Sequence, residues 1–248
     1  MSVKRIQSGL HQIRLPGVNC FLLESESDGL ILVDTGVPGS GASISRAVYS
    51  LGRDLSEIKN ILVTHCHPDH AGGLAEMKAL TSARVFMHRR DALLVATGQA
   101  MRRLLPAPGI LNAILYRFMI APKPTTVPPS KADELVENGD VIPVAGGISV
   151  IHTPGHTEGH IVYLARDRGV AFLGDAASNL LGLRLMIAYE HLQQGIMSLR
   201  HLCRYDFDVA CFGHGPPIRQ GASDRFRERW GQGRMAKRRN QPSGIIIR

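Results

Sequence analysis

Short apolar runs alternate along the chain with segments that have apolar residues at helical spacing. The runs predict strands, and the periodic segments predict helices. We expect strands at residues 11–14, 20–24, 30–33, 61–63, 84–87, 141–144, 148–152, 161–165, 170–173 and 208–212. We expect helices at 43–51, at 71–80, from Arg89 onward and at 189–204. This order is typical of an α/β fold in which packed sheets are covered by helices.

The alternation is interrupted between about residues 93 and 130. Apolar residues at helical spacing run from Leu104 to Ile120, and prolines from Pro122 to Pro129 mark the exit as a loop. We expect a helical lid or flank here. A second apolar stretch covers residues 180–187. Three interpretations of both stretches stay open: a pocket wall, core packing or a homodimer contact. If they form a pocket wall, the substrate has an apolar portion.

Length and composition fit one catalytic domain, because 248 residues with 44% hydrophobic content can bury a substantial core. No apolar run is long enough to span a bilayer, and the N-terminus lacks a signal-peptide pattern, so we expect a cytoplasmic protein. The four cysteines have no C-x-x-C spacing, and we expect them to be reduced. They are Cys20, Cys66, Cys203 and Cys211.

Positive charge is concentrated near the C-terminus. The chain has a net charge of +8, and the segment from Arg200 onward holds most of the excess. We therefore divide the chain into a catalytic domain at 1–221, with its insertion at about 93–130, and a C-terminal helix and basic tail at 222–248. The tail suits contact with nucleic acid or an acidic membrane. A solvated terminus is the better expectation, so we do not predict a nucleic-acid partner.

The segment 65–70 reads His-Cys-His-Pro-Asp-His and directly follows an apolar run. Imidazole and carboxylate are ligands that zinc and other divalent ions favour, and burying them without a cation would be costly. His65 and His67 lie two apart and can point to one side of an extended segment. Pro68 keeps His67 out of the helical region, so Asp69 and His70 can turn toward a second ion. One loop can therefore serve two metals.

Three later segments share a simpler pattern, in which an apolar run is followed by a glycine and then by a histidine or an aspartate, residue types that bind metals. These segments end in His156, Asp175 and His214. Loops at strand ends are where a rigid scaffold usually presents functional groups. We predict that these three side chains complete the metal site.

The full pattern, HxHxDH followed by H, D and H, resembles the signature of the metallo-β-lactamase superfamily. The similarity runs from about residue 19 to residue 217 and includes the turn Asp34-Thr35-Gly36. It implies a four-layer αβ/βα sandwich, with two metals between the sheet edges. Seven positions carry the resemblance: His65, His67, Asp69, His70, His156, Asp175 and His214.

The resemblance also implies a role for each of these side chains. His65, His67 and His156 would hold one ion, whereas Asp69, His70 and His214 would hold the other, with Asp175 bridging the two. Asp34 is similar to a carboxylate that supports a ligating imidazole; from its position alone it is equally a strand-end turn residue. We expect the remaining histidines to be surface or core residues without a metal-binding role. They are His11, His88, His152, His160, His191 and His201. This expectation is least secure for His160.

A dinuclear site of this kind predicts a hydrolase. Two neighbouring ions lower the pKa of a shared water, and the resulting hydroxide can attack an acyl carbonyl while Asp69 or Asp175 takes up the proton. Zinc is the first expectation, and manganese or iron would suit the same ligands. The resemblance also implies that true β-lactamases have a different ligand pattern, in which this bridging carboxylate is absent. Asp175 therefore argues against β-lactamase activity. We expect hydrolysis of a small-molecule ester, lactone or thioester.

The sequence departs from two enzyme types of the superfamily, glyoxalase II and the lactonases, so neither activity can be assigned directly. The segment after His214 is too short for the helical domain of a glyoxalase II, and Ser178 stands where many lactonases have tyrosine. Two other enzymes remain as alternatives: a phosphodiesterase or nuclease that uses the basic tail, and an iron-dependent persulfide dioxygenase. A binding module on a decayed hydrolase fold is disfavoured by the intact ligand set.

Overall fold

The structure is a computed structural model that describes residues 2–122 and 124–231. Within that range the larger sheet has seven strands in the order β1-β2-β3-β4-β5-β6-β8. They are β1 (Ser2–Gln7), β2 (Leu10–Leu15), β3 (Val18–Ser25), β4 (Gly29–Val33), β5 (Ile58–Leu62), β6 (Arg84–His88) and β8 (Glu134–Val136). β1 to β4 pair antiparallel, whereas β4, β5, β6 and β8 run parallel. The segment 65–70 therefore begins where these parallel strands end together.

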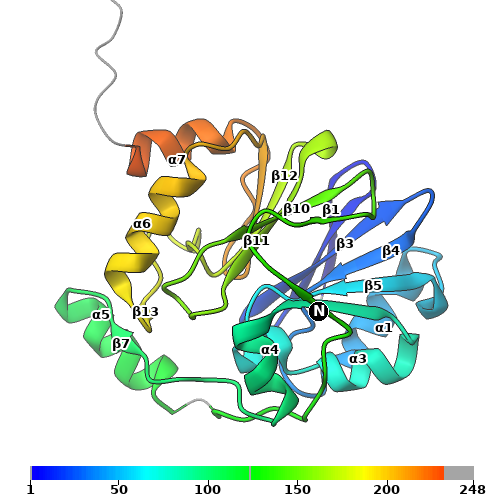
Figure 1. Ribbon diagram of the computed structural model, residues 1–248, viewed down its shortest axis with the longest axis horizontal. Helices are drawn as coiled ribbons and strands as arrows, with labels where there is room; N and C mark the ends of the chain where they lie inside the picture. Colours follow the sequence, from blue (N-terminus) through cyan, green and yellow to red (C-terminus); the bar gives the residue numbers. More distant parts are fainter. Residues whose placement is uncertain (1, 123, 232–248) are drawn as a thin grey trace, which may run out of the picture.

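The smaller sheet faces the first (Figure 1) and has five strands in the order β14-β12-β11-β10-β9 over the same described range. They are β9 (Val141–Ile142), β10 (Ile148–His152), β11 (Ile161–Ala165), β12 (Val170–Gly174) and β14 (Val209–Phe212). Only the β12–β14 pair among them is parallel. His156, Asp175 and His214 each follow a strand of this sheet, so both sheets contribute to the site.

Helices cover the outer face of each sheet. On the larger sheet lie α1 (Gly41–Ser50), α3 (Leu74–Thr81) and α4 (Arg89–Ala96), and on the smaller lie α6 (Leu192–Leu202) and α7 (Ala222–Trp230). Figure 1 shows the two sheets between these groups of helices. Short helical turns are η1 (Leu55–Glu57), α2 (Pro68–Ala71) and η3 (Arg166–Arg168). The predicted four-layer αβ/βα sandwich is confirmed.

The alternation of side chains along the strands builds three apolar layers. In β3, Cys20 and Leu22 pack toward the helices, whereas Phe21 and Leu23 pack between the sheets. β11 and β12 alternate in the same way between the central layer and the layer beneath α6 and α7. Successive residues of a strand point to opposite faces, and here both faces are covered. This explains why the strands appear in the sequence as continuous apolar runs.

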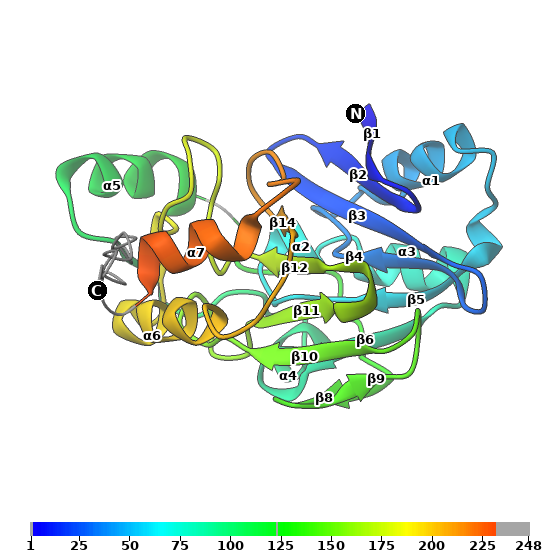
Figure 2. The same cartoon turned by 90° about the horizontal axis from the view of Figure 1, so that it is seen from above.

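The insertion differs from the prediction at its start. Residues near Leu104 were expected to be helical, but Leu105–Pro106 forms strand β7, which pairs with β13 (Ala188–Tyr189). Pro106 and Pro108 lack the backbone N–H that a helix interior needs, so the helix begins only at Ile110. α5 (Ile110–Leu115) continues into a π-helical segment, η2 (Tyr116–Ile120). Figure 2 shows α5 at one end of the molecule.

Two predicted helices had wrong boundaries, and two strands were missed. The helix predicted at 71–80 is divided at Gly72-Gly73 into α2 and α3, because glycine gives a weak helix interior. The helix predicted at 189–204 begins at Leu192, since Tyr189 pairs with β7 instead. Strands β1 and β8 at the ends of the larger sheet were not predicted.

The C-terminal part of the described chain packs against the smaller sheet. α7 contacts α6, and Phe226 is fully buried in the layer beneath them. The basic run 237–239 lies outside the described residues. Across residues 2–122 and 124–231, no helix combines the length and the apolar character that crossing a bilayer requires. The four cysteines are free thiols, as expected.

Candidate metal centre

The HxHxDH loop is shaped by the end of β5 and by one proline. His67 is extended (φ −55°, ψ 149°) and precedes Pro68, which occupies the first turn of α2. Proline suits this position because its missing N–H would be unpaired there in any case. His65 and His67 therefore remain on the extended segment, while Asp69 and His70 lie on the helical turn. Cys66 points away from them into the core beside the helices.

The structure brings all seven predicted side chains together, and most of them are buried. Their ligand atoms form three overlapping groups in which all atoms lie within 4.8 Å of one another. The groups are His65, His67 and His156, then Asp69, His70 and His214, and finally His65, His70 and Asp175. The first two coincide with the two ligand sets that the resemblance implies. The third connects them.

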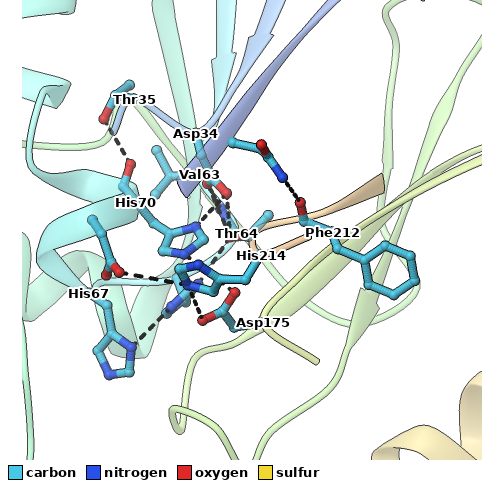
Figure 3. A network of polar contacts seen from close by, with 12 residues as sticks. Asp34, Thr35, Val63, Thr64, His67, His70, Asp175, Phe212 and His214 are labelled. Atoms are coloured by element: carbon cyan, nitrogen blue, oxygen red, sulfur yellow. Dashed lines mark hydrogen bonds and ion pairs between the residues drawn. The ribbon is translucent and has the colours of Figure 1, made fainter. Parts of the chain in front are cut away.

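Asp175 lies between the two sets. Its Oδ2 atom is 3.3 Å from Nε2 of His156 and 3.1 Å from Nε2 of His214, and its Oδ1 atom is 3.4 Å from Nε2 of His70. Figure 3 shows Asp175, His70 and His214 directed toward one another. One carboxylate thus reaches both groups. Asp69 and His214 are the more exposed members, with side chains 11% and 14% exposed, and they lie 3.7 Å apart.

Three imidazoles of the cluster are each oriented by a partner outside it. Nδ1 of His156 donates to the Ala188 carbonyl (3.0 Å), and Nδ1 of His214 donates to the Gly17 carbonyl (2.6 Å). Nδ1 of His65 lies 3.0 Å from the Thr64 hydroxyl. These bonds leave the other ring nitrogen free to bind a metal, as is usual for ligating histidines.

The inward nitrogens have the arrangement that a metal site requires. Nε2 of His65 and Nδ1 of His67 are 3.1 Å apart, close to the roughly 3.3 Å between two nitrogens on a tetrahedral zinc ion. Over residues 2–122 and 124–231, six buried side-chain nitrogen or oxygen atoms lack a hydrogen-bond partner, and four of them lie here. They are Nε2 of His67, His70 and His156, and Oδ1 of Asp175. Buried polar atoms are rarely left unpaired, so this donor set fits divalent cations.

Asp34 supports the centre from behind His70. Its Oδ2 atom accepts a hydrogen bond from Nδ1 of His70 (2.8 Å), and Oδ1 accepts from the Thr64 backbone N–H (2.8 Å). Its backbone is in the left-handed region, with φ 59°. Asp34 is therefore both a strand-end turn residue and a partner of a candidate ligand. Figure 3 shows Asp34 and Thr64 beside the His70 ring.

The cluster has two electrostatic halves. Burial and the neighbouring imidazoles lower the pKa values of His65 and His67 well below their usual range, so both are neutral, the form that binds metals. Burial also opposes charge on His70, but Asp175 and Asp34 raise its pKa well above the ordinary value. Asp175 has a lowered pKa despite burial, because His214 and His70 lie against it. Positive charge is thus favoured around Asp175, whether from protons or from cations.

Two of the glycines that precede the candidate ligands allow close approach. A Cβ atom on Gly213 would lie 2.4 Å from Oδ1 of Asp175 and 2.5 Å from Cε1 of His70. A Cβ atom on Gly155 would lie 2.2 Å from the backbone nitrogen of Gly195. All three distances are below van der Waals contact. The repeated order of strand, glycine and ligand therefore has a steric cause at these positions.

His160 has a larger part in the site than its sequence position indicated. It is fully buried, its Nδ1 atom lies 2.8 Å from the Thr153 hydroxyl, and its Nε2 atom accepts the backbone N–H of Asp175 (3.0 Å). The expectation of a satisfied core residue fits these bonds, yet they also hold Asp175 in place. Within the described residues, the other five dismissed histidines belong to no group able to hold a metal.

Sequence reasoning missed Asp91 and Glu190, two buried carboxylates near the centre. Asp91 accepts the backbone N–H of Cys66, and Glu190 accepts that of Glu158. Asp91 lies in the first turn of α4 and Glu190 follows the short strand β13, which are ordinary positions for acidic residues. No sequence spacing distinguishes them, because their partners come from distant loops.

The fold and this histidine-aspartate cluster together define the class of metal-dependent hydrolases built on paired sheets. The sequence profile of the metallo-beta-lactamase superfamily matches residues 13–214. The chain therefore belongs to the metallo-beta-lactamase superfamily, and the predicted resemblance is confirmed.

Individual relatives agree with this placement. The chain is 34% identical to the uncharacterized protein YobT of Bacillus subtilis over 64% of its own length and 61% of the relative. It is 29% identical to a hydroxyacylglutathione hydrolase of Rhodopseudomonas palustris, with 71% and 59% covered, and 28% identical to the thioesterase pkgB of Emericella nidulans, with 83% and 48% covered. The chain thus spans about three fifths or less of these relatives.

Solved structures show the same fold. A subclass B3 metallo-beta-lactamase of Bradyrhizobium japonicum superposes with a TM-score of 0.68 at 22% identity, covering 93% of this chain and 90% of the other. At that identity the likeness concerns the fold alone. The predicted membership of a superfamily of metal-dependent hydrolases is confirmed by the profile and by the hydrolase names of the relatives.

Proposed function

We propose that this chain is a dinuclear metal-dependent hydrolase of a small-molecule ester, lactone or thioester. One observation carries the proposal: Asp175 reaches His156 in one ligand group and both His70 and His214 in the other. A carboxylate shared in this way suits two neighbouring divalent ions. Zinc is the first expectation for this nitrogen and oxygen set, with manganese or iron as alternatives. His65, His67 and His156 would hold one ion, and Asp69, His70 and His214 the other.

The chain's own residues define what the site can do. Bound divalent ions would supply a water-derived nucleophile near neutral pH and would polarise an acyl carbonyl. Asp69 is better placed than Asp175 to take up a proton, because Asp175 is enclosed by three imidazoles and Asp69 is the more exposed carboxylate. We propose no nucleophilic serine or cysteine, since Cys66 points into the core.

The surroundings of His156 support a substrate with an apolar portion. The Tyr189 ring lies 5.8 Å from the His156 ring in an edge-to-face arrangement. Tyr189 belongs to a small apolar cluster with Met186 and Ala107, beside Leu185. The relatives named as a thioesterase and as a hydroxyacylglutathione hydrolase are in keeping with this reaction class. Four free cysteines are in keeping with the expected cytoplasmic compartment.

The test combines metal analysis with a substrate panel. Protein purified without added metal is analysed for zinc, manganese and iron, then assayed with lactones, thioesters, acyl esters and phosphodiesters. We expect two divalent ions per chain and turnover of one acyl class. His67→Ala and Asp175→Ala should lose turnover by several orders of magnitude while their circular dichroism spectra stay unchanged. His201→Ala is the matched control, because His201 lies outside the cluster and contacts only the Tyr205 hydroxyl in its side-chain bonds.

Other results would favour the alternatives. Cleavage of phosphodiesters alone, with steep dependence on salt, would identify a phosphodiesterase or nuclease. A single iron per chain together with oxygen consumption on a persulfide would identify a dioxygenase. Unchanged acyl hydrolysis in Asp175→Ala would refute the role that we assign to this carboxylate.

A further inference from the structure

The insertion exposes an apolar surface, which we call the arm. It comprises β7, α5 and η2, and no residue of α5 or η2 is buried. Large apolar side chains on the arm are from 49% to 82% exposed. They are Leu105, Ile110, Leu111, Ile114, Phe118 and Met119. Scattered single apolar residues need no explanation, but a gathered set of this size marks an interaction surface.

The charge around the arm has one sign. Residues 92–132 contain no aspartate or glutamate, and neither do residues 176–189, which include β13 beside the arm. Arg103, Arg117 and Arg184 are exposed in these two segments. Leu180 and Leu181, 58% and 80% exposed, precede β13 in the second segment. In these two segments the exposed apolar side chains are therefore accompanied by basic residues and by no acidic ones.

We propose that the arm docks on an anionic phospholipid surface. Exposed apolar residues on a short helix, together with basic residues, are the features of interfacial helices, which bury one side in the headgroup region. Charge complementarity selects this occupant over a second copy of the chain, because two arms facing each other would bring arginines together without carboxylates. Nothing in this docking requires a helix that crosses the bilayer.

The position of the arm connects docking with the metal centre. β7 pairs with β13 through Leu105 and Tyr189, and Tyr189 lies against His156. A lipid surface held by the arm would therefore lie beside the His156 side of the site. If the proposed function is correct, this arrangement favours an acyl substrate that partitions into membranes. The docking itself is independent of turnover and is tested without it.

The experiment measures co-sedimentation of the full chain with vesicles. Vesicles of phosphatidylglycerol mixed with phosphatidylcholine should bind the protein, and pure phosphatidylcholine should bind it weakly. Binding should decrease as salt screens the charges. The double variant Ile110→Glu/Phe118→Glu should lose binding. The double variant Arg103→Gln/Arg117→Gln should weaken vesicle binding by about 30-fold, because each cation near the surface contributes roughly 1 kcal/mol and two are removed.

A matched control separates the arm from the rest of the surface. Leu135→Glu/Val141→Glu replaces two residues that are 57% and 60% exposed on β8 and β9, and it should bind like the wild type. Circular dichroism and thermal midpoints verify that every variant folds. The basic tail is present in all of them, so persistent binding of Ile110→Glu/Phe118→Glu would assign lipid binding to the tail and overturn the proposal. Equal binding to both vesicle types, or an arm-dependent dimer in light scattering without lipid binding, would also overturn it.

A separate observation concerns Asp91, a fully buried carboxylate that joins two ligand loops. Its Oδ2 atom accepts the backbone N–H of Cys66 (3.1 Å), between His65 and His67, and the Thr157 hydroxyl (2.6 Å), next to His156. Its Oδ1 atom accepts the backbone N–H of Gly159 (3.0 Å). Arg102 of the insertion donates to the same Oδ1 atom (2.9 Å) and also lies 3.4 Å from Oε1 of Glu190, so this cation is shared by two buried carboxylates.

The geometry points to Asp91 as a positioning residue for the group His65, His67 and His156. It touches none of these side chains, but it fixes the backbone on either side of them. Breaking a buried, hydrogen-bonded charge network is costly, so the bonds of Asp91 hold the two loops in a fixed position relative to each other. Outer partners of this kind typically affect metal affinity by about 10–100-fold.

The test is the affinity for zinc, measured by competition with a chelating dye, which does not depend on turnover. Asp91→Asn should weaken one of the two zinc sites by about 10–100-fold and alter the visible spectrum of the cobalt-substituted protein. Thr157→Val removes one bond without leaving a charge unpaired, and it should give a smaller loss if Asp91→Asn fails to fold. Asp133→Asn is the control, because Asp133 also accepts a backbone N–H but lies outside the metal-binding groups. Lower stability with unchanged zinc affinity and cobalt spectrum would overturn the assignment.

Discussion

Oδ2 of Asp34 lies 2.8 Å from Nδ1 of His70, although Asp34 adopts a left-handed backbone that most residues avoid. Asparagine tolerates this conformation as well as aspartate does, so Asp34→Asn removes the charge with little backbone strain. We expect this variant to bind zinc about 10–100-fold more weakly, because His70 loses its carboxylate partner. Competition with a chelating dye measures the change. Glu26→Gln, at an exposed site, should have no effect; equal affinities in both variants would contradict the role of Asp34.

The sequence predicted those parts of the fold that local patterns determine. Strands such as β3 and β11 were found because both of their faces are buried, which produces continuous apolar runs. The candidate ligand set was found because three imidazoles and a carboxylate gather within residues 65–70, and because the later positions complete a family pattern. The ligand roles themselves stay predictions, since they depend on ions.

Features that depend on distant contacts could not be predicted. β7 and β13 are each two residues long and are defined only by their mutual pairing. Asp91 has four partners from three separate segments, and none of them is marked by spacing. The apolar residues near Leu104 do have helical spacing, but Pro106 and Pro108 prevent a helix there because proline has no backbone N–H to donate. Local propensity fails where tertiary pairing or a missing donor determines the backbone.

Metal should contribute directly to stability. Ions that bind only the folded chain stabilise it by mass action, by about 2.7 kcal/mol at a free concentration 100 times the Kd. For a domain of this size we expect the thermal midpoint to rise by about 5–10 °C when zinc is restored to chelator-treated protein. Scanning calorimetry at several zinc concentrations measures the shift. His201→Ala should keep the full shift, His67→Ala should lose much of it, and identical curves with and without zinc would argue against a structured metal site.

Gly213 tests the steric fit of the centre. A Cβ atom there would overlap Asp175 and His70, and Gly213 is not among the glycines with positive φ, so Gly213→Ala acts through space alone. We expect weaker zinc binding and a loss of about 1–3 kcal/mol in stability. Gly52→Ala is the comparison, because a Cβ atom at Gly52 meets open space although its φ is +72°. It should cost about 1–2 kcal/mol and leave zinc affinity unchanged. If Gly213→Ala binds zinc like the wild type, the cluster is looser than its geometry indicates.

Phe226 offers a test of the division predicted at residue 221. The centroid of its ring lies 5.5 Å from the ring centroid of Phe207, 4.9 Å from that of Trp230 and 6.4 Å from that of Phe212. Its side chain is fully buried. Removing a buried ring costs its burial and leaves a cavity, so Phe226→Ala should destabilise the protein by about 3–5 kcal/mol. Arg229→Ala, on the exposed side of the same helix, should change stability by less than about 0.5 kcal/mol. Urea unfolding followed by circular dichroism measures both. A small effect of Phe226→Ala would mean that α7 folds apart from the sheets, whereas a large effect in one cooperative transition would extend the catalytic domain to the end of α7.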